Sequence, residues 1–284
     1  MNKLSNIKKH EAMMENIQKL LKNVESVLVF AGAGMSADSG LPTYRDKEGF
    51  WNHYPLYKKL NKNYMDFTNS NGFRKKPIHA WGFYGHLYNL YKNALPHSGY
   101  KVLKIFFEEN KKNYFIISSN VDGLFLKAGY NPKYVHEVHG VIRKFQCAIP
   151  CHRKVWEPDN WIFDIDERTM TVTNELPTCP KCNSKARPNI FMFNDNDNSY
   201  IWEEAQKGAK KLEDWMKKYA KTKVLILLIG VGQDGLKSHA KQYSKLCGNA
   251  KIVCINPDIC EYEKENDFII LQGKAKNTLE KLMI

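Results

Sequence analysis

Residues 31–45, AGAGMSADSGLPTYR, carry the residue types in this chain that most clearly indicate chemistry. They follow an apolar run, VLVF at 27–30, and a strand that leads into Gly-x-Gly brings backbone amides close to a phosphate. The segment Gly40-Leu41-Pro42 prevents the long helix that usually follows such glycines. A flexible segment with hydroxyl groups and a guanidinium takes its place, in Ser36, Ser39, Tyr44 and Arg45. We therefore predict a nucleotide cofactor that is attacked as well as held.

The glycine pattern by itself has a second interpretation, a tight strand-to-helix turn without a ligand. An ordinary dehydrogenase site would add an acidic residue about 20 positions later, at the end of a strand, and that residue is missing. Ser36 also suits a helix cap, and Arg45 suits the protein surface as well as a pyrophosphate. The glycine loop alone therefore does not establish a cofactor site, and the prediction of a site unlike that of a dehydrogenase depends on residues elsewhere in the chain.

Three polar residues follow later apolar runs. Asn120 and Asp122 come directly after residues 114–118, YFIIS, and His139 follows the next strand candidate. The amide and the carboxylate predict recognition of a ribose and an amide, and an Asx-turn at the strand end is the alternative. Because histidine titrates near neutral pH, His139 suits a general base. His136 lies three residues earlier, so strand alternation places it on the opposite face.

The seven cysteines include two close pairs, Cys147-x3-Cys151 and Cys179-x2-Cys182, which are separated by 27 residues. Two short-spaced pairs predict a closed tetrahedral zinc site, and because such a site has no open position the zinc would be structural. One alternative is mixed ligation, in which His152 replaces a thiolate. Free reduced cysteines are the other.

Short apolar strands alternate with helical patterns, which is typical of an α/β fold with a parallel sheet. Strands are expected at 27–30, 114–118, 134–138, 189–193, 224–229, 251–255 and 268–271. Helices are expected at 10–23, 79–91, 102–109, 124–128, 201–219, 238–246 and after Gly273. The carboxyl ends of such strands line one crevice, where the polar residues would meet. We predict a Rossmann-like, doubly wound sheet from residues 1–45, 99–140 and 188–284, with a helical insertion at 46–98 and a zinc-binding insertion at 141–187.

The 284 residues carry a net charge of +13, from 43 Lys and Arg against 30 Asp and Glu. The lysines are dispersed along the chain, so we do not expect a nucleic acid partner. The first 23 residues lack the apolar core of a signal peptide, and the longest apolar run, 224–229, is too short to span a bilayer. We expect a soluble, cytoplasmic protein without a membrane partner.

Together these motifs resemble the sirtuin family of NAD-dependent protein deacylases, from about Glu15 to the C-terminus. The family's cofactor loop, Gly-Ala-Gly-x-Ser-x-x-Ser-Gly-Ile-Pro-x-Phe-Arg, is matched by residues 32–45, and its Gln-Asn-Ile/Val-Asp by 119–122. Its catalytic His-Gly is matched by His139-Gly140, and the cysteine quartet follows at the expected distance. The resemblance implies that NAD is bound by Gly32, Ala33, Gly34, Ser36, Ser39, Tyr44, Arg45, Asn120, Asp122, Gly230, Gly232, Asn256 and Ala275.

The implied activity is deacylation, in particular deacetylation, of lysine on a protein or peptide, with release of nicotinamide and O-acyl-ADP-ribose. His139 would deprotonate a ribose hydroxyl as general base, and Asn120 would be the second catalytic residue. One structural zinc ion would be held by Cys147, Cys151, Cys179 and Cys182. NAD glycohydrolysis or ADP-ribosyl transfer is one alternative function, and a non-catalytic NAD-binding interaction protein is another.

The chain departs from the family pattern in four places. Tyr44 replaces the usual Phe, Ser119 replaces Gln, and Gly230-Val231-Gly232 replaces Gly-Thr-Ser and so loses two hydroxyls. Further, the family runs to Phe-Gly-Glu in the region that pairs with the substrate backbone, whereas this chain reads FNDNDN at 193–198. We predict a flexible, acidic loop there that alters peptide binding.

Overall fold

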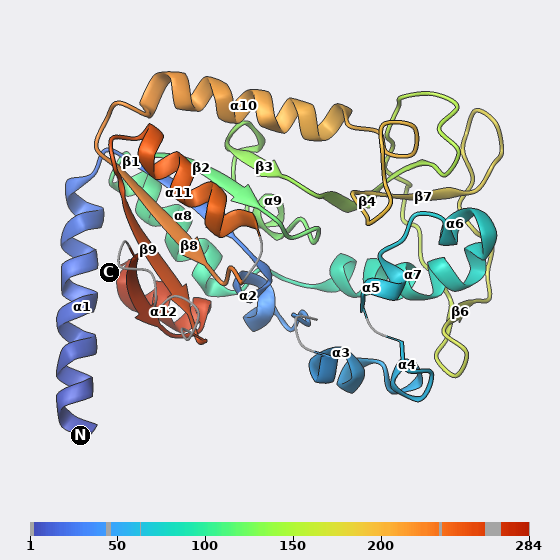
Figure 1. Cartoon of the computed structure of the whole chain (residues 1–284), viewed down its shortest axis with the longest axis horizontal. Helices are drawn as coiled ribbons and strands as arrows, with labels where there is room; N and C mark the ends of the chain where they lie inside the picture. The colour runs from blue at the N-terminus through green and yellow to red at the C-terminus, as the bar shows by residue number, and fades with distance from the viewer. Residues whose placement is uncertain (1–2, 44–46, 63, 233–234, 259–267, 284) are drawn as a thin grey trace.

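The computed structural model describes residues 3–43, 47–62, 64–232, 235–258 and 268–283. Six of its strands form one parallel sheet in the order β10-β9-β8-β1-β2-β3. Their bounds are β1 Ser26–Ala31, β2 Asn113–Ser118, β3 Val135–Glu137, β8 Val224–Ile229, β9 Lys251–Asn256 and β10 Phe268–Gln272. The strand order reverses at β1, which lies between β2 and β8, and ligands bind at such a switch point. The predicted doubly wound α/β fold is confirmed (Figure 1).

The central strands are apolar on both faces because each face is covered. Every residue of β1 and of β8 is buried. In β1, Val27 and Val29 belong to one apolar cluster while Leu28 and Phe30 belong to another, as the alternation of a strand requires. Such strands appear in the sequence as continuous hydrophobic runs, so their bounds were predicted to within a residue or two.

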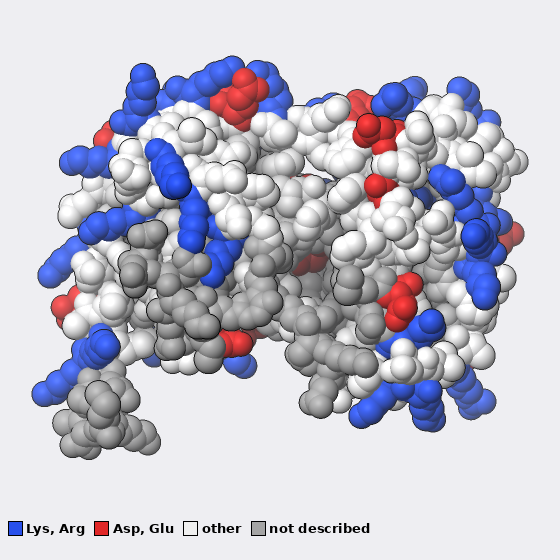
Figure 2. All heavy atoms as spheres, viewed as in Figure 1, with Lys and Arg blue, Asp and Glu red and all other residues white. Residues whose placement is uncertain are grey.

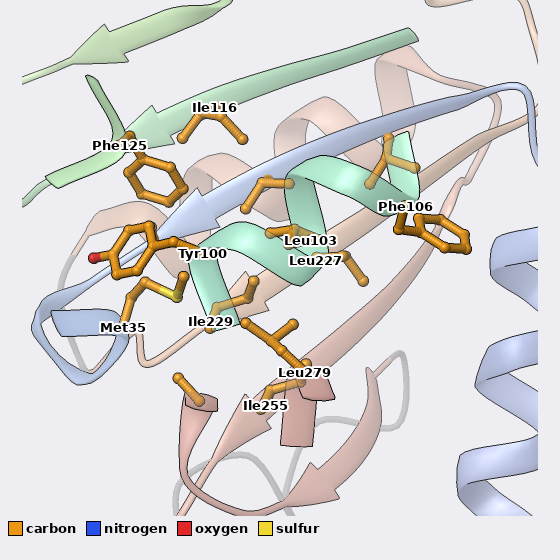
Figure 3. Packing of buried hydrophobic residues seen from close by; sticks show 14 of the residues in the cluster. Met35, Tyr100, Leu103, Phe106, Ile116, Phe125, Leu227, Ile229, Ile255 and Leu279 are labelled. Atoms are coloured by element: carbon orange, nitrogen blue, oxygen red, sulfur yellow. The ribbon is translucent and has the colours of Figure 1, made fainter. Parts of the chain in front are cut away.

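Helices cover the two faces of the sheet. On the first face lie α1 Lys3–Asn23, α8 Ser98–Glu109, α9 Leu124–Lys127 and α12 Ala275–Leu282. On the other lie α10 Glu203–Tyr219 and α11 Gly235–Leu246. Figure 3 shows the first core, where Leu103 and Phe106 of α8 and Leu279 of α12 pack on the strands. Among the described residues, no helix combines the length and apolar character needed to cross a bilayer.

The rest of the described chain builds a separate, mainly aromatic core. Its helices are α3 Lys47–His53, α4 Pro55–Lys59, α5 Tyr64–Phe67, α6 Gly72–Lys75 and α7 Pro77–Asn93. Its strands are β4 Gly140–Cys147, antiparallel to β7 Ala186–Ile190, and the short pair β5 Ile165–Asp166 and β6 Thr171–Val172. Trp81 of α7 stacks on Phe163 at 4.5 Å and donates its indole hydrogen to Ala186 O at 2.9 Å. The helical segment and the cysteine-containing segment therefore share one core.

Several elements differ from the sequence prediction at their ends. Helix α1 begins at Lys3, and α8 begins at Ser98 because the His97 side chain accepts a hydrogen bond from the amide of Gly99. Residues 132–134 form the 3-10 turn η2, Pro132–Tyr134, so β3 is shorter than expected. The strand expected at 189–193 is β7, shifted toward the N-terminus. The predicted boundary between 187 and 188 consequently falls inside a strand.

Candidate active site and metal centre

The glycine loop after β1 lies directly against the turn after β8. Gly32 N donates to Ile229 O and Gly34 N donates to Gly230 O, both at 3.0 Å. A side-chain carbon on Gly34 would lie 2.7 Å from Gly230 Cα, and Gly230 itself has a φ of +59°. Only glycine permits this approach of two backbones. The short helix α2, Ala33–Ser36, follows, and the 3-10 turn η1, Ala37–Ser39, ends at Gly40 with a φ of +80°.

A buried hydrogen-bond cluster joins the glycine loop to the end of β2. Asn120 Nδ2 donates to Gly32 O and to Ser36 Oγ, both at 2.9 Å. Ser36 Oγ donates to Asp122 Oδ2 at 2.6 Å, and Asp122 Oδ1 accepts from the amide of Leu124 at 2.9 Å. Burial raises the pKa of Asp122, and the bonds from Ser36 and Leu124 oppose that rise. Asp122 therefore makes the Asx-turn that was the alternative and also faces the cofactor loop.

His139 lies just past the end of β3, at the same edge of the sheet. Its Nδ1 lies 3.1 Å from Ser119 O, and its own carbonyl oxygen accepts from the amide of Phe191 at 2.9 Å. Because a carbonyl oxygen only accepts, Nδ1 carries the proton of the neutral ring and Nε2 carries the lone pair. The exposed ring thus presents a basic nitrogen next to the residues that follow β2.

His136 packs in the interior of the protein and does not face the candidate site. It is buried in β3 against α10, where a side-chain carbon on Gly208 would lie 1.8 Å from its Nδ1. Burial, with the nearby charge of Lys211, lowers the pKa of His136 to about 4, so the ring is neutral at ordinary pH. The strand ends at Glu137, so the alternation used to separate the two histidines does not extend to His139.

The remaining sequence-predicted cofactor residues lie around the same switch point. Asn256, at the end of β9, donates from Nδ2 to Val231 O at 2.6 Å and so holds the turn that contains Gly230 and Gly232. Ser39 Oγ accepts from the amide of His97 at 3.0 Å. Ala275 is the first residue of α12 and is buried. Tyr44 and Arg45 lie outside the described residues.

Sequence reasoning missed two side chains beside this cluster. Tyr100 of α8 lies with its hydroxyl 2.9 Å from Ser36 Oγ. Glu137 ends β3, and burial raises its pKa to about 7 against the opposing charge of Arg143. Glu137 had a usable signal, because it is an acid at the carboxyl end of a predicted strand. Tyr100 had none, because it sits within the apolar face of a helix.

A cavity of about 220 Å³ adjoins Asp122 on another side. Its walls include Tyr88 and Tyr91 of α7, Lys127 of α9 and Arg143 of β4. Figure 2 shows the molecule hollowed between the half with the parallel sheet and the half with the aromatic core, with acidic side-chain atoms at the bottom. The candidate site therefore lies where the two halves meet.

The four paired cysteines converge on one point. The sulfur atoms of Cys147, Cys151, Cys179 and Cys182 all lie within 4.8 Å of one another. The pairs Cys147–Cys182 and Cys151–Cys179 are 3.7 Å apart. A tetrahedral zinc with bonds of about 2.3 Å needs sulfurs about 3.8 Å apart, so the donor set fits this ion. His152 Nε2 lies 3.3 Å from Cys179 Sγ, where it hydrogen-bonds to a ligand sulfur rather than replacing one.

The family follows from a comparison with known proteins. The model of the Sir2 family matches residues 32–227, more than half of the chain. The chain belongs to the Sir2 family. The match spans the glycine loop, Asn120, Asp122, His139 and the cysteine quartet.

Individual Sir2 relatives match over most of the chain. An NAD-dependent protein deacylase from Leptospira interrogans is 29% identical over 271 residues, which is 95% of this chain and 97% of the relative. One from Campylobacter jejuni is 28% identical over 83% of this chain and 85% of its own. Among solved structures, a Sir2 homologue in complex with ADP-ribose has a TM-score of 0.71 at 24% identity, covering 95% of this chain and 94% of that one. A Sir2 homologue–NAD complex has a TM-score of 0.67 at 23% identity, covering 95% and 92%.

Where the Sir2 pattern has Phe-Gly-Glu, the predicted acidic loop presents only one of its two aspartates to solvent, because Asp197 is exposed and the Asp195 side chain is buried. Its flexibility and its effect on peptide binding stay predictions. Asp195 faces inward, and its carboxylate forms a two-bond ion pair of 2.7 Å with buried Arg187. It also accepts from the amide of Met192 at 2.9 Å. Asn194 replaces the glycine at a φ of +67°, a conformation that asparagine tolerates. The alternating Asn and Asp residues predicted a solvent-exposed loop, but Asp195 anchors the loop to Arg187.

Two other departures from the Sir2 pattern, at Ser119 and Val231, keep backbone contacts beside the candidate site, and Tyr44 lies outside the described residues. At Ser119 the backbone oxygen, not the side chain, contacts His139. Val231, in place of a hydroxyl residue, is fully buried, and the backbone of its turn makes the contacts to Gly34 and Asn256.

Proposed function

We propose that this chain is an NAD-dependent protein-lysine deacylase that removes an acetyl or related acyl group and yields nicotinamide and O-acyl-ADP-ribose. The observation that carries the proposal is the contact of His139 Nδ1 with Ser119 O, which leaves the lone pair of the ring on Nε2. Ser119 directly precedes Asn120, whose side chain bonds the glycine loop. The Sir2 relatives named as deacylases support the same activity.

Each group at the switch point has a proposed task. NAD would supply a cationic nicotinamide as leaving group on its ribose, and the acyl oxygen of the lysine would be the nucleophile for that carbon. Asn120 and Asp122 hold the ribose and the amide at that end. His139 Nε2 takes a proton from a ribose hydroxyl, which then attacks the acyl carbon. The glycine loop, with Ser39, Tyr44 and Arg45, would receive the phosphates. Ser36, which the sequence also assigned to the cofactor, would act behind the loop, because its hydroxyl already bonds Asn120, Asp122 and Tyr100.

The adenosine end of NAD is proposed to lie on the other side of β1. Gly230, Gly232 and Asn256 would contact it there, with Ala275 at the start of α12. In this proposal, residues 1–45, 99–140 and 188–284 form the domain that binds the cofactor. Residues 46–98 and 141–187 would cover the nicotinamide end and admit the acylated peptide.

The cysteine quartet is proposed to hold one structural zinc ion. Four thiolates leave no position for water, so zinc takes no part in the chemical steps. A set of four reduced thiols suits the cytoplasm, where we place the protein. An acylated lysine on a protein or peptide is the proposed partner, without a membrane or nucleic acid.

One assay tests this function against its alternatives. The chain is incubated with NAD, with and without an acetyl-lysine peptide, and nicotinamide release is followed. Release that needs the peptide, with O-acetyl-ADP-ribose detected by mass spectrometry, supports deacylation. Peptide-independent release means a glycohydrolase or ADP-ribosyltransferase. Absence of release means a non-catalytic NAD-binding protein.

A further inference from the structure

Tyr100 lies in the first turn of α8 and is fully buried. Its ring centroid is 4.9 Å from those of Phe125 and His97. Figure 3 shows it between Phe125 and Met35, with its hydroxyl oxygen pointing away from the aliphatic side chains of the core. A buried tyrosine hydroxyl needs a hydrogen-bond partner, and the partner is Ser36 Oγ at 2.9 Å.

The Ser36 hydroxyl has one hydrogen and two lone pairs, so its bonds can be counted. The 2.6 Å bond to the Asp122 carboxylate uses the hydrogen. Asn120 Nδ2, at 2.9 Å, donates to one lone pair. The second lone pair is left for Tyr100, which is therefore the donor in this contact.

The protonation of Tyr100 agrees with this assignment. Burial, with the nearby charge of Asp122, raises the pKa of Tyr100 well above its usual range, so the phenol keeps its hydrogen at neutral pH. A donor to Ser36 Oγ also polarises the Ser36 hydroxyl and strengthens the bond that it donates onward. All bonding positions of Ser36 are filled when the three neighbours are in place.

We propose that Tyr100 is a positioning residue of the cofactor site. By donating to Ser36, it fixes the Ser36 hydrogen on Asp122 and so sets the orientation of Asp122 and Asn120. Tyr100 itself touches no substrate. This role rests on the proposed function, in which Asn120 and Asp122 bind the nicotinamide end of NAD.

The test is Tyr100→Phe, which removes one oxygen and keeps the ring packing. We expect NAD to bind about three- to tenfold more weakly, the effect of one lost hydrogen bond. ADP-ribose keeps the ribose that Asn120 holds but lacks the nicotinamide that Asp122 holds, so its affinity falls by less than that of NAD. Calorimetric titration with NAD and with ADP-ribose measures both affinities without relying on turnover.

Tyr130→Phe is the matched control. Its buried hydroxyl donates to the Tyr100 carbonyl oxygen at 2.9 Å, not to Ser36. We expect a comparable loss of thermal stability in both variants but an unchanged NAD affinity in Tyr130→Phe. In a Ser36→Ala background, Tyr100→Phe has no further effect, because the two residues act through one contact.

Three results overturn the role of Tyr100. They are an unchanged NAD affinity in Tyr100→Phe, an equal loss for NAD and ADP-ribose, and an equal loss in Tyr130→Phe. Losses that add in the double variant also contradict it. If the unaltered chain binds no NAD, the proposed function itself fails. If the unaltered chain binds NAD and Tyr100→Phe binds it equally well, only the role of Tyr100 fails.

Discussion

At the scale of single residues, one backbone contact decides what His139 can do. Because Ser119 O holds the Nδ1 hydrogen, the lone pair lies on Nε2. We predict that His139→Ala lowers kcat for an acetyl-lysine peptide by about 10²-fold or more, the range of general-base catalysis. NAD affinity, measured by titration, stays nearly unchanged because the proposed binding contacts lie on the glycine loop and on Asn120 and Asp122. Weakened NAD binding with kcat preserved would contradict the assignment.

Glu137 predicts how stability depends on pH. Its pKa is raised to about 7 by burial, so the folded chain binds this proton more tightly than the unfolded chain does. The stability that this proton contributes is complete below the unfolded pKa of 4.5 and is lost as pH rises through about 7. Because the Glu137 side chain is only partly buried, we expect the free energy of unfolding to fall by about 2 kcal/mol over this pH range.

Denaturant unfolding at pH 5 and pH 8 measures this dependence. Glu137→Gln removes its share of the fall in stability, and the pH dependence that persists belongs to other buried groups with shifted pKa values, among them Asp122 and His136. Glu157→Gln is the control, since Glu157 is 53% exposed beside the same Arg143. A pH dependence that is the same in Glu137→Gln as in the unaltered chain would exclude Glu137 as its source.

At the scale of elements, the loop after β7 is held by one ion pair. The side chains of Arg187 and Asp195 are 1% and 0% exposed, and Asn69 forms an isolated β-bridge with Phe193 of the same loop. Although burial opposes ionisation, the bonds and charge of Arg187 hold the pKa of Asp195 below its ordinary value. Phe193, 56% exposed, is thus presented from a fixed loop.

We predict that Asp195→Asn lowers the free energy of unfolding by about 3 kcal/mol, because it leaves a buried guanidinium uncompensated. Limited proteolysis within 191–199 becomes faster, and KM for the peptide rises more than KM for NAD. Lys210→Ala, which breaks an exposed pair with Glu213, is the control and changes stability by less than about 0.5 kcal/mol. Unaltered proteolysis in Asp195→Asn would show that the pair does not anchor the loop.

Elements differ in how far sequence predicts them. The central strands and Asn120, Asp122 and His139 were predictable because polar residues followed apolar runs at the same edge of a parallel sheet. Strand β4 was missed, because GVIRKFQC places charges inside a strand that pairs with β7 through a shifted register and bridges to Trp156 at Phe145. Tyr100 and Asp195 were not predictable either, since their roles depend on the distant partner Ser36 and on the inward turn of Arg187.

At the scale of the whole molecule, the two cores are stabilised differently. The parallel sheet has apolar clusters on both faces, whereas the aromatic core includes Phe145 and Ala148, which flank Cys147 of the quartet. Two of its sulfurs, Cys147 and Cys179, are buried, and Cys147 ends β4. A bound zinc would therefore tie β4 to the turn at 179–182, so metal loss would loosen the aromatic core before the sheet.

We predict one zinc per chain by elemental analysis, and we expect a chelator to abolish deacylation while the far-ultraviolet signal of the parallel-sheet half persists. Cys182→Ser removes one exposed ligand and so loses the metal. Cys247→Ser is the matched control, because this buried thiol belongs to the apolar cluster of α11 on the sheet. It keeps one zinc per chain and its deacylation activity. Full zinc content in Cys182→Ser, or activity that survives complete removal of the metal, would show that the quartet does not hold the aromatic core in its working form.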